Sequence, residues 1–477
     1  MTQRTFKLED QLRFAHLSGD YNPIHVDPSV ARRMLFGGAV VHGVHLVLYC
    51  LDQFLQTTDS SEWVIDKLNV VFQKSVRVGE CVSLRVVRSD LEETRGSFKA
   101  KLMVNGAMVT TVSATLAMRR NTDDEEFSSV LLDEATPEQT KARVVSPVDL
   151  ETQSGELPLN WSLDLAAQLF PDAAGKLPAA QLAGLLCSTR LIGMVCPGLN
   201  SIFAELSLQR DSCEPRRFEY TVDRYDERFS LAMIGAKSPG LSGQLRAFVR
   251  PMQRTQRDYD SVCSEVPAGS FQGSRVLVIG GSRGLGEVAS KILCAGGAQV
   301  LFTYHGGQQD AQDLVADIVG GGGQVTAERY DVTGDVPPTS LLPDPDWIPT
   351  HVLYFATPRI FSGSRGIFSE TIFRGFCDYY VGGFQRIVAA LYPLGTRHYY
   401  VPSSSAIDEQ VPDMTEYIAA KSAAESASLV LSEQHSDIVI DQPRLPRLAT
   451  DQTVTLSEST EADPLPVLSE ELQRFMK

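Results

Sequence analysis

The hydrophobic positions near the start of the chain follow first a helical and then a strand-like period. Residues 36–55 form a long apolar stretch of helical length and period. Four segments follow in which apolar and polar residues alternate, at residues 66–79, 80–92, 94–106 and 107–120. One long helix followed by a string of strands predicts a helix wrapped by a curled antiparallel sheet.

The same order of elements recurs after an acidic, turn-rich segment at residues 121–154, which we predict to be a linker. A helical region at 162–195 precedes four further strand-like segments. Residues 67–90 and 203–226 match in the order strand, polar turn, strand and final Arg and Asp. We therefore predict an internal duplication, with residues 155–252 as the second copy and 1–120 as the first.

The pattern changes in the last third of the chain. A polar segment at residues 253–273 predicts a second linker, and beyond it strand-like and helix-like segments alternate. Examples are the strand-like residues 275–280 and 299–304 on either side of the helix-like residues 285–297. This alternation predicts a doubly wound parallel sheet in residues 274–477.

Composition narrows the function classes. The chain has 477 residues, of which 43% are hydrophobic and 21% charged, and its formal net charge is −16. This acidic balance argues against a nucleic-acid or membrane-surface partner, because both prefer a basic surface. No apolar run approaches ~20 residues, and the first residues lack the apolar segment of a signal peptide. The 8 cysteines include no C-x-x-C pair, so we expect a cytoplasmic protein with no bound metal.

The stretch FAHLSGDYNPIHVDP, residues 14–28, carries candidate acid/base chemistry. Asp20 and His25 lie in one loop, with Asn22 between them and Pro23 stiffening it. A carboxylate and an imidazole on a rigid loop can hold one water between them and move its protons. Gly43, at the expected start of the apolar helix, can offer its N–H to a developing oxyanion. A plain capping loop is the alternative, and spacing alone does not decide between the two.

The stretch SGDYNPIHVDPSVARRMLFGGAVVHGVH resembles the signature of the MaoC-like, (R)-specific enoyl-CoA hydratases and dehydratases, which have the hot-dog fold. The resemblance implies that Asp20 and His25 are the catalytic pair, that Asn22 orients them, and that the Gly43 N–H binds the thioester carbonyl. It also implies acyl thioesters of CoA or acyl carrier protein as substrates. For the neighbouring histidines we expect packing or hydrogen-bonding roles; these are His16, His42 and His45.

The second copy departs from this signature. It has LFPDAAGKLP where the first has LSGDYNPIH, so Asp172 aligns with Asp20 but no histidine follows, and residues 155–252 contain none at all. We therefore expect a double hot-dog with a single active site. A single copy would leave a sheet edge open.

A second constellation lies in the last third. The turn GGSRGLG follows the strand-like residues 275–279 and opens a helix-like segment, the arrangement that places a pyrophosphate at a helix N-terminus. Tyr417 and Lys421 are four residues apart on one helix face, so the lysine could lower the pKa of the phenol. Ser404, with Ser403 and Ser405 as alternatives, is placed to hydrogen-bond a carbonyl.

These residues resemble the short-chain dehydrogenase/reductase family over residues 274–435. The resemblance implies Ser404, Tyr417 and Lys421 as the catalytic set and a nicotinamide cofactor. The residues predicted to bind the cofactor are Gly280, Ser282, Arg283, Gly284, Leu285, Gly286 and Asp331. No acid ends the strand-like residues 299–304 and Arg283 lies in the glycine turn, so we expect NADP(H) in preference to NAD. One departure is Tyr380, which replaces the family's usual asparagine.

Together these patterns predict an α+β double hot-dog domain followed by an α/β Rossmann-like domain. The predicted function is a bifunctional acyl-thioester enzyme, a hydro-lyase and an NADP-dependent 3-oxoacyl reductase, as in fatty-acid or polyketide metabolism. It would reduce a 3-oxoacyl thioester to the (R)-3-hydroxyacyl compound and dehydrate that to the 2-enoyl product, or run the hydration. The alternative is a hydratase or dehydratase alone, with a catalytically weak or structural reductase-like domain. A non-enzymatic scaffold is disfavoured by the spacing of both residue sets, and we expect a homodimer.

Overall fold

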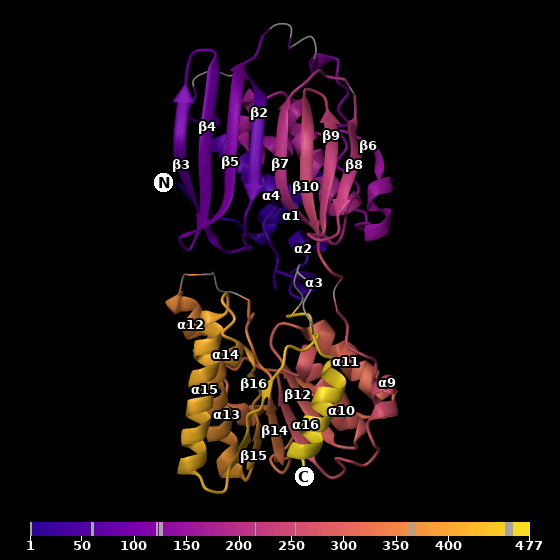
Figure 1. Ribbon diagram of the computed structural model, residues 1–477, viewed down its shortest axis with the longest axis vertical. Helices are drawn as coiled ribbons and strands as arrows, with labels where there is room; N and C mark the ends of the chain where they lie inside the picture. Colours follow the sequence, from indigo (N-terminus) through magenta and orange to yellow (C-terminus); the bar gives the residue numbers. More distant parts are fainter. Residues whose placement is uncertain are drawn as a thin grey trace. The chain divides into compact units, whose positions relative to one another are not determined.

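A computed structural model describes residues 2–58, 62–120, 123, 127–214, 216–252, 254–361, 366, 368–453 and 461–477. Two compact units divide the chain, with the boundary after Met252. Unit 1 precedes this boundary and unit 2 follows it (Figure 1).

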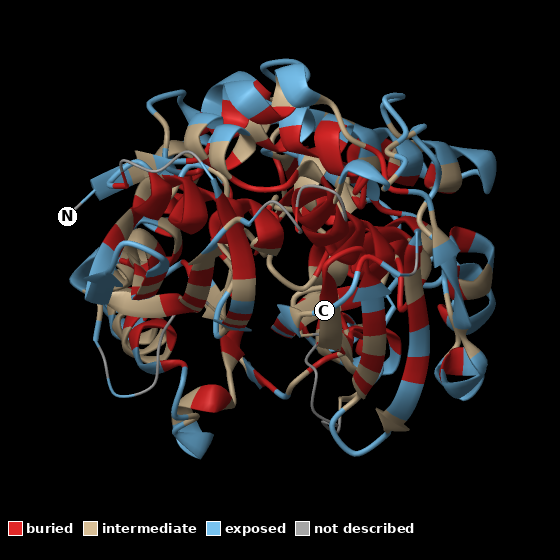
Figure 2. Cartoon of the chain, turned by 90° about the horizontal axis from the view of Figure 1, so that it is seen from above, coloured by how far each residue is buried: buried red, intermediate tan, exposed pale blue. Residues whose placement is uncertain are grey.

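Unit 1 contains one antiparallel sheet in which, among the described residues, ten strands pair in the order β1-β3-β4-β5-β2-β7-β10-β9-β8-β6 (Figure 1). The strands are β1 (Thr2–Thr5), β2 (Trp63–Phe72), β3 (Cys81–Leu91), β4 (Arg95–Val104), β5 (Ala107–Met118), β6 (Ser154–Leu157), β7 (Ser201–Arg210), β8 (Phe218–Asp226), β9 (Leu231–Ser238) and β10 (Leu241–Val249). Buried and more exposed residues alternate along strands such as β4, and Figure 2 shows this as bands of colour. The period of two predicted from the sequence therefore separates a buried face from an outer face.

Each half of this sheet has the same order of elements. In the first half, helix α4 (Gly43–Leu55) precedes four strands that lie in the order β3-β4-β5-β2. In the second half, helix α8 (Ala179–Arg190) precedes four strands in the order β8-β9-β10-β7. Strands β2 and β7 pair antiparallel in the middle, so the two halves share one sheet.

The two long helices supply the centre of the unit 1 core. Residues of α4 and α8 are buried almost throughout, because both helices are apolar on most faces, and they join one hydrophobic cluster that spans both halves. Shorter helices complete the unit: α1 (Leu8–Ser18), α2 (Pro23–Val26), α3 (Pro28–Ala31), α6 (Leu163–Leu169) and α7 (Pro171–Lys176). A π-helical turn, Leu191–Val195, continues α8 and becomes important for the site.

The segment 121–154, predicted to be a linker, is fixed to unit 1 by some of its described residues. Asp123 is buried in an ion pair with Arg210. Leu150 lies in the main core, within a 3-10 turn spanning Pro147–Thr152. Apolar side chains in an otherwise polar stretch are the physical reason, since burying them fixes the segment to the unit.

Unit 2 contains a parallel sheet in the order β13-β12-β11-β14-β15-β17. This is the doubly wound order, in which strands are added on one side of β11 and then, starting with β14, on its other side. The strands are β11 (Arg275–Ile279), β12 (Gln299–Tyr304), β13 (Gln324–Arg329), β14 (His351–Tyr354), β15 (His398–Tyr400) and β17 (Val439–Asp441), and a separate pair is formed by β16 (Ser403–Ser404) and β18 (Arg444–Leu445). The doubly wound parallel sheet predicted from strand–helix alternation is therefore present in unit 2.

Helices cover this sheet (Figure 1). They are α9 (Tyr259–Glu265), α10 (Gly284–Ala295), α11 (Gln308–Gly320), α12 (Glu370–Cys377), α13 (Phe384–Leu391), α14 (Ala406–Glu409), α15 (Thr415–Gln434) and α16 (Pro464–Phe475). The segment 253–273, predicted to be a linker, is instead part of unit 2, because Tyr259, Val262 and Phe271 are buried in its core. Among the helices that the structure describes, none combines the length and apolar character needed to cross a membrane.

Candidate active sites

The loop that carries Asp20 and His25 is held at both ends by helix caps. Helix α1 ends at Gly19, whose left-handed φ of +77° lets its N–H bond the Ala15 carbonyl. Asn22 caps α2, because its side-chain oxygen accepts from the Ile24 N–H at 3.2 Å, and Pro23 takes the first helical position. The sequence S-G-D-Y-N-P therefore forms a rigid turn, and His25 lies in the single helical turn that follows.

Asp20 is buried, and its carboxyl group is held from two sides. Thr189 donates from Oγ1 to Oδ2 at 2.6 Å, and the Asn22 main-chain N–H donates to Oδ1 at 3.3 Å. Burial raises the pKa of Asp20 above its ordinary 3.8, although His25 and both hydrogen bonds oppose that rise. The site therefore favours the protonated carboxyl more strongly than water does.

His25 has one ring nitrogen committed and one available. Nδ1 lies 2.8 Å from the Val40 carbonyl oxygen, which only accepts hydrogen bonds, so Nδ1 carries the hydrogen. In the neutral ring the lone pair is then on Nε2. Burial lowers the pKa of His25 below its ordinary 6.5, and Arg250 lowers it further, while Asp20 and the Val40 bond act in the opposite direction. A neutral imidazole with a free Nε2 is a general base.

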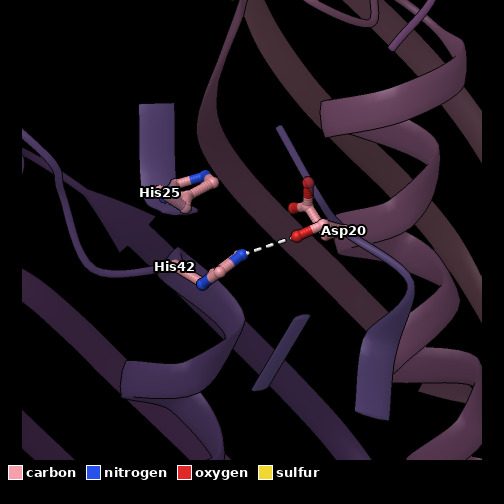
Figure 3. Close-up of side chains that lie close together, drawn as sticks. All are labelled: Asp20, His25 and His42. Atoms are coloured by element: carbon pink, nitrogen blue, oxygen red, sulfur yellow. Dashed lines mark hydrogen bonds between the residues drawn. The ribbon is translucent and has the colours of Figure 1, made fainter. Parts of the chain in front are cut away.

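His42 stacks on His25, with 3.9 Å between ring centroids and 23° between ring planes. Its Nε2 lies 2.9 Å from the Asp20 main-chain oxygen (Figure 3). Its Nδ1 lies 3.0 Å from Gln11 Oε1. These contacts agree with the hydrogen-bonding role expected for His42. His45 differs, since it stacks on Phe14 and no partner is recorded for either ring nitrogen.

Ligand atoms of Asp20, His25 and His42 lie within 4.8 Å of one another, a grouping that could hold a metal ion. An imidazole lone pair lies in the ring plane, so two histidines that share one ion must point at it from different directions. The rings of His25 and His42 instead stack nearly parallel, and both ring nitrogens of His42 already lie at hydrogen-bond distance from other oxygens. This geometry suits proton transfer better than metal binding.

Gly43 occupies the first position of α4, where main-chain N–H groups have no partner within the helix. A Cβ atom at Gly43 would lie 2.9 Å from the Phe72 ring, so any side chain at this position would crowd the ring next to the first N–H of the helix. Asn22, predicted to orient the catalytic pair, uses its side-chain amide differently. Its Nδ2 donates to the Gly193 carbonyl at 2.8 Å, which ties the loop to the second half of the sheet.

The second half contributes residues that sequence reasoning missed. Thr189 touches the Asp20 carboxyl, and a Cβ atom at Gly193 would overlap that carboxyl. The stretch CSTRLIGMV offers one weak signal, a threonine and a glycine at the end of an apolar helix. Asp172, aligned with Asp20 by sequence, pairs with Lys176 at 2.9 Å, and its main-chain N–H donates to Asp52.

In unit 2 the glycine turn lies where β11 leads into α10. Gly280 and Gly284 have φ values of +81° and +58°, and a Cβ atom at Gly286 would overlap the Gly280 carbonyl. These three glycines therefore make a tight turn at the N-terminus of a twelve-residue helix. The predicted neighbours Ser282 and Leu285 lie in the same turn, Ser282 being buried and Leu285 packing against the unit 2 core. Such a turn fits a pyrophosphate.

Two charged residues border this turn. Arg283 pairs with Asp451, 2.9 Å between Nη1 and Oδ2, and Asp451 Oδ1 would lie 3.7 Å from a Cβ atom at Gly284. Asp331 follows β13, accepts from the Thr333 hydroxyl and main-chain N–H, and lies 3.7 Å from His305. The Thr333 bond is the main reason that the pKa of Asp331 is lowered. The Asp451 carboxylate is thus paired with Arg283, the residue predicted to bind a cofactor phosphate.

Ser404, Tyr417 and Lys421 are brought together in unit 2. Tyr417 and Ser404 share a side-chain hydrogen bond, and Lys421 Nζ donates to the Pro402 carbonyl at 2.8 Å. Burial raises the pKa of Tyr417, so the expected lowering by Lys421 is wrong. The reason is geometric, because Nζ lies 6.0 Å from the centre of the Tyr417 ring and turns to the carbonyl. Burial lowers the pKa of Lys421 to about 8. Of the two alternatives to Ser404, Ser403 bonds Glu425 and the Ser405 N–H donates to Leu445.

Tyr380 lies beside this group. Lys421 Nζ is 4.2 Å from the centre of its ring, a cation–π distance, and its hydroxyl is 2.5 Å from Thr357 Oγ1. Tyr380 stands where the sequence departs from the pattern of the family that it resembles. Tyr380 and Thr357 therefore form a hydrogen-bonded pair next to Lys421.

Comparison with known proteins identifies the first part of the chain. The family model of the MaoC-like domain matches residues 2–112, so this part of the chain is a MaoC-like domain, as its residues predicted. No curated protein matches the chain.

Solved structures that match the chain include dehydrogenases and reductases. One is an oxidoreductase from E. coli, with 16% identity over 44% of this chain and 92% of that chain and a TM-score of 0.39. Another is an alternative dihydrofolate reductase from Brucella suis in complex with NADP, with 17% identity over 36% and 71% and a TM-score of 0.32. A third is a short-chain dehydrogenase/reductase variant from Serratia marcescens, with 19% identity over 43% and 90% and a TM-score of 0.34.

Proposed function

We propose that unit 1 is a double hot-dog domain with one active site, which adds water to 2-enoyl thioesters or removes it from (R)-3-hydroxyacyl thioesters. The observation that carries this proposal is the proximity of Asp20 and His25, whose ligand atoms lie within 4.8 Å of each other in a loop where burial disfavours the charged form of both groups. The MaoC-like match over residues 2–112 supports it. The R configuration follows the family that these residues resemble.

The residues can perform hydration in one balanced step. Nε2 of His25 takes a proton from water as the water oxygen bonds to C3, and the Asp20 carboxyl gives its proton to C2. The Gly43 N–H, at the positive end of α4, stabilises the charge that grows on the thioester oxygen. A proton then passes from the imidazolium to the carboxylate and restores both groups. Dehydration is the same sequence reversed.

For unit 2 we propose an NADP(H)-dependent 3-oxoacyl thioester reductase. The glycine turn fits the pyrophosphate, because Gly280, Gly284 and Gly286 leave no side chain in its way. Arg283 would hold the 2′-phosphate and Asp331 the adenine end. A nicotinamide cofactor bound here would supply the hydride. Ser404 would hold the substrate carbonyl, Tyr417 would give it a proton, and Lys421 would complete the catalytic set.

The two activities share one intermediate, the (R)-3-hydroxyacyl thioester, which would be carried by CoA or acyl carrier protein. Reduction in unit 2 would produce it and dehydration in unit 1 would consume it, as in fatty-acid or polyketide assembly. The contact between Lys421 and Tyr380 favours the second candidate function, a hydratase or dehydratase alone, because an aromatic ring replaces a family asparagine next to the lysine.

Mass spectrometry of one incubation tests both halves of the proposal. Acetoacetyl-CoA and its carrier-protein analogue are each incubated with the protein and NADPH. Reduced and dehydrated thioester are expected from the wild type, reduced thioester alone from Asp20→Asn, and unchanged substrate from Tyr417→Phe. Unchanged substrate with the wild type would refute the reductase, and unchanged crotonyl-CoA in a separate hydration assay, together with its carrier-protein analogue, would refute the hydratase.

A further inference from the structure

The second half of unit 1 has no histidine, yet its main helix ends at the site of the first half. Helix α8 reaches Asp20 with the penultimate residue, Thr189, and the π-helical turn that follows reaches it with Gly193. A half retained only to close the sheet would need neither contact. The question is what the contacts do for the acid.

The Thr189 hydroxyl is committed to Asp20. It is buried, and its Oγ1 lies 2.6 Å from Asp20 Oδ2 across 169 positions of sequence. The neighbouring hydroxyl behaves in the ordinary way for a helix, since Ser188 Oγ donates to the Leu185 carbonyl at 2.6 Å within α8. Two adjacent buried hydroxyls on one helix therefore have different partners, and only one serves the site.

Gly193 holds the other side of the carboxyl. The Asp20 oxygens pack so closely on its Cα that any Cβ there would overlap them. The Gly193 carbonyl also accepts from the Asn22 amide at 2.8 Å, so the same turn fixes the loop on which Asp20 is carried. The carboxyl is thus confined between a hydroxyl and a backbone, both from the second half.

The contact of α8 with the first half has a counterpart, in which α4 of the first half contacts the second half. Near the end of α4, in the first half, Asp52 Oδ1 accepts from the main-chain N–H groups of Asp172 and Ala173 at 2.9 and 3.0 Å. The end of each long helix therefore contacts a segment of the other half. In the first half this segment is the loop that carries the acid, whereas in the second half it is the first turn of helix α7, which carries an ion-paired Asp172.

We propose that Thr189, supplied by the half without a histidine, is a positioning residue that fixes the orientation of the Asp20 carboxyl for proton transfer. The inference rests on the proposed hydratase function of unit 1 and deepens it. The Thr189 bond also stabilises the ionised carboxyl, so it lowers the pKa of Asp20 against the effect of burial. Loss of the hydroxyl should thus release the carboxyl and make it a weaker acid.

Three variants of the full chain test this, namely Thr189→Val, Thr189→Ser and Ser188→Ala. Valine keeps the shape of threonine, serine restores the hydroxyl, and Ser188→Ala removes an equally buried hydroxyl that does not touch Asp20. Two quantities are measured. One is the pH profile of kcat/KM for crotonyl-CoA hydration. The other is an infrared titration of the Asp20 carboxyl, assigned by the band that Asp20→Asn removes.

Thr189→Val is expected to lower kcat/KM about tenfold or more, as for a lost hydrogen bond to a charged group. It should also move the alkaline limb of the profile and the infrared midpoint to higher pH. Thr189→Ser should return both toward wild type, and Ser188→Ala should leave both unchanged. An infrared midpoint that stays at the wild-type pH in Thr189→Val would overturn the proposal.

The infrared titration separates this proposal from the proposed function. If the wild type hydrates no thioester but the midpoint still moves in Thr189→Val alone, the hydratase assignment fails and the Thr189 contact stands. Gly193→Ala provides a second variant, since the added Cβ must displace the carboxyl without removing the Thr189 hydroxyl. It should lower kcat/KM while the unfolding midpoint shows that the chain still folds. Wild-type kcat/KM in this variant would contradict the confinement of Asp20.

Discussion

At the scale of single residues, burial prepares Asp20 and His25 for opposite tasks by the same effect. Removing a group from water disfavours its charged form, so the pKa of the acid rises and that of the base falls. Burial therefore shifts the pair toward a protonated carboxyl and a neutral imidazole. These are the two forms that the proposed hydration would consume.

The pH dependence of hydration should follow from these directions. His25 must be without its extra proton, so kcat/KM should fall on the acid side at a pH below 6.5, because burial lowers the pKa of His25 from that value. Asp20 must hold its proton, so the alkaline limb should lie above 3.8, because burial raises the pKa of Asp20 from that value. Stopped-flow hydration of crotonyl-CoA across pH measures both limbs, and dehydration should require the opposite protonation states. An acid limb above 6.5 would contradict the assignment of His25 as the base.

Gly43→Ala should lower hydration without unfolding the chain. The added Cβ would meet the Phe72 ring at 2.9 Å and narrow the approach to the first N–H of α4. We expect kcat/KM to fall about tenfold or more, as when an oxyanion donor is obstructed. Gly38→Ala is the matched control, because a Cβ there meets nothing within 4 Å. Equal activity in the two variants would argue against an oxyanion role for Gly43.

The residues predictable from sequence are those whose chemistry is local. Asp20, Asn22 and His25 lie within six positions, so a rigid loop brings them together whatever the rest of the fold does. Thr189 contacts Asp20 across 169 positions, and this pairing depends on how two helices end in the folded unit. No spacing in the sequence indicates it.

At the scale of elements, the α10 turn raises a question of charge. A helix N-terminus with three glycines favours an anion, yet Asp451 pairs with Arg283 at 2.9 Å and lies beside Gly284. In the proposed reductase this carboxylate would compete with the cofactor phosphate for Arg283.

Asp451→Asn should therefore tighten NADPH binding. The substitution removes a negative charge beside the proposed phosphate site, and we expect the Kd to fall about tenfold, equivalent to ~1.4 kcal/mol. Titration calorimetry or NADPH fluorescence measures this. Asp437→Asn is the matched control, since Asp437 forms an ion pair with Arg397 elsewhere in unit 2. Weaker NADPH binding in Asp451→Asn would show that the carboxylate supports the site instead of competing for it.

Periodicity predicted most elements because alternation reports which face of a strand is buried. Periodicity did not show that the two predicted linkers pack, because each has only a few apolar residues within a polar stretch of sequence. Tyr259 and Phe271 are buried in unit 2, and Leu150 is buried in unit 1. Isolated apolar residues carry no period, so the sequence does not show that the segments pack.

At the scale of the whole molecule, the described residues form separate cores. The cluster of unit 1 spans both halves of its sheet, and the clusters of unit 2 share no residue with it. Halving unit 1 would divide one core, expose the β2 edge that pairs with β7, and remove Thr189 from Asp20. We therefore expect the two halves to fold as one unit and both to be needed for the proposed hydration.

Chain fragments should behave accordingly. Residues 1–252 are expected to fold with one cooperative transition and to hydrate crotonyl-CoA at a rate within about threefold of the full chain, because the core and both sides of the Asp20 site are retained. Residues 1–120 should be aggregated or inactive, because β2 loses its pairing with β7 and Asp20 loses Thr189. Circular dichroism on heating and the hydration assay measure both, with Asp20→Asn in residues 1–252 as the folded, inactive control. Hydration by residues 1–120 at the full rate would show that the second half is dispensable for the chemistry.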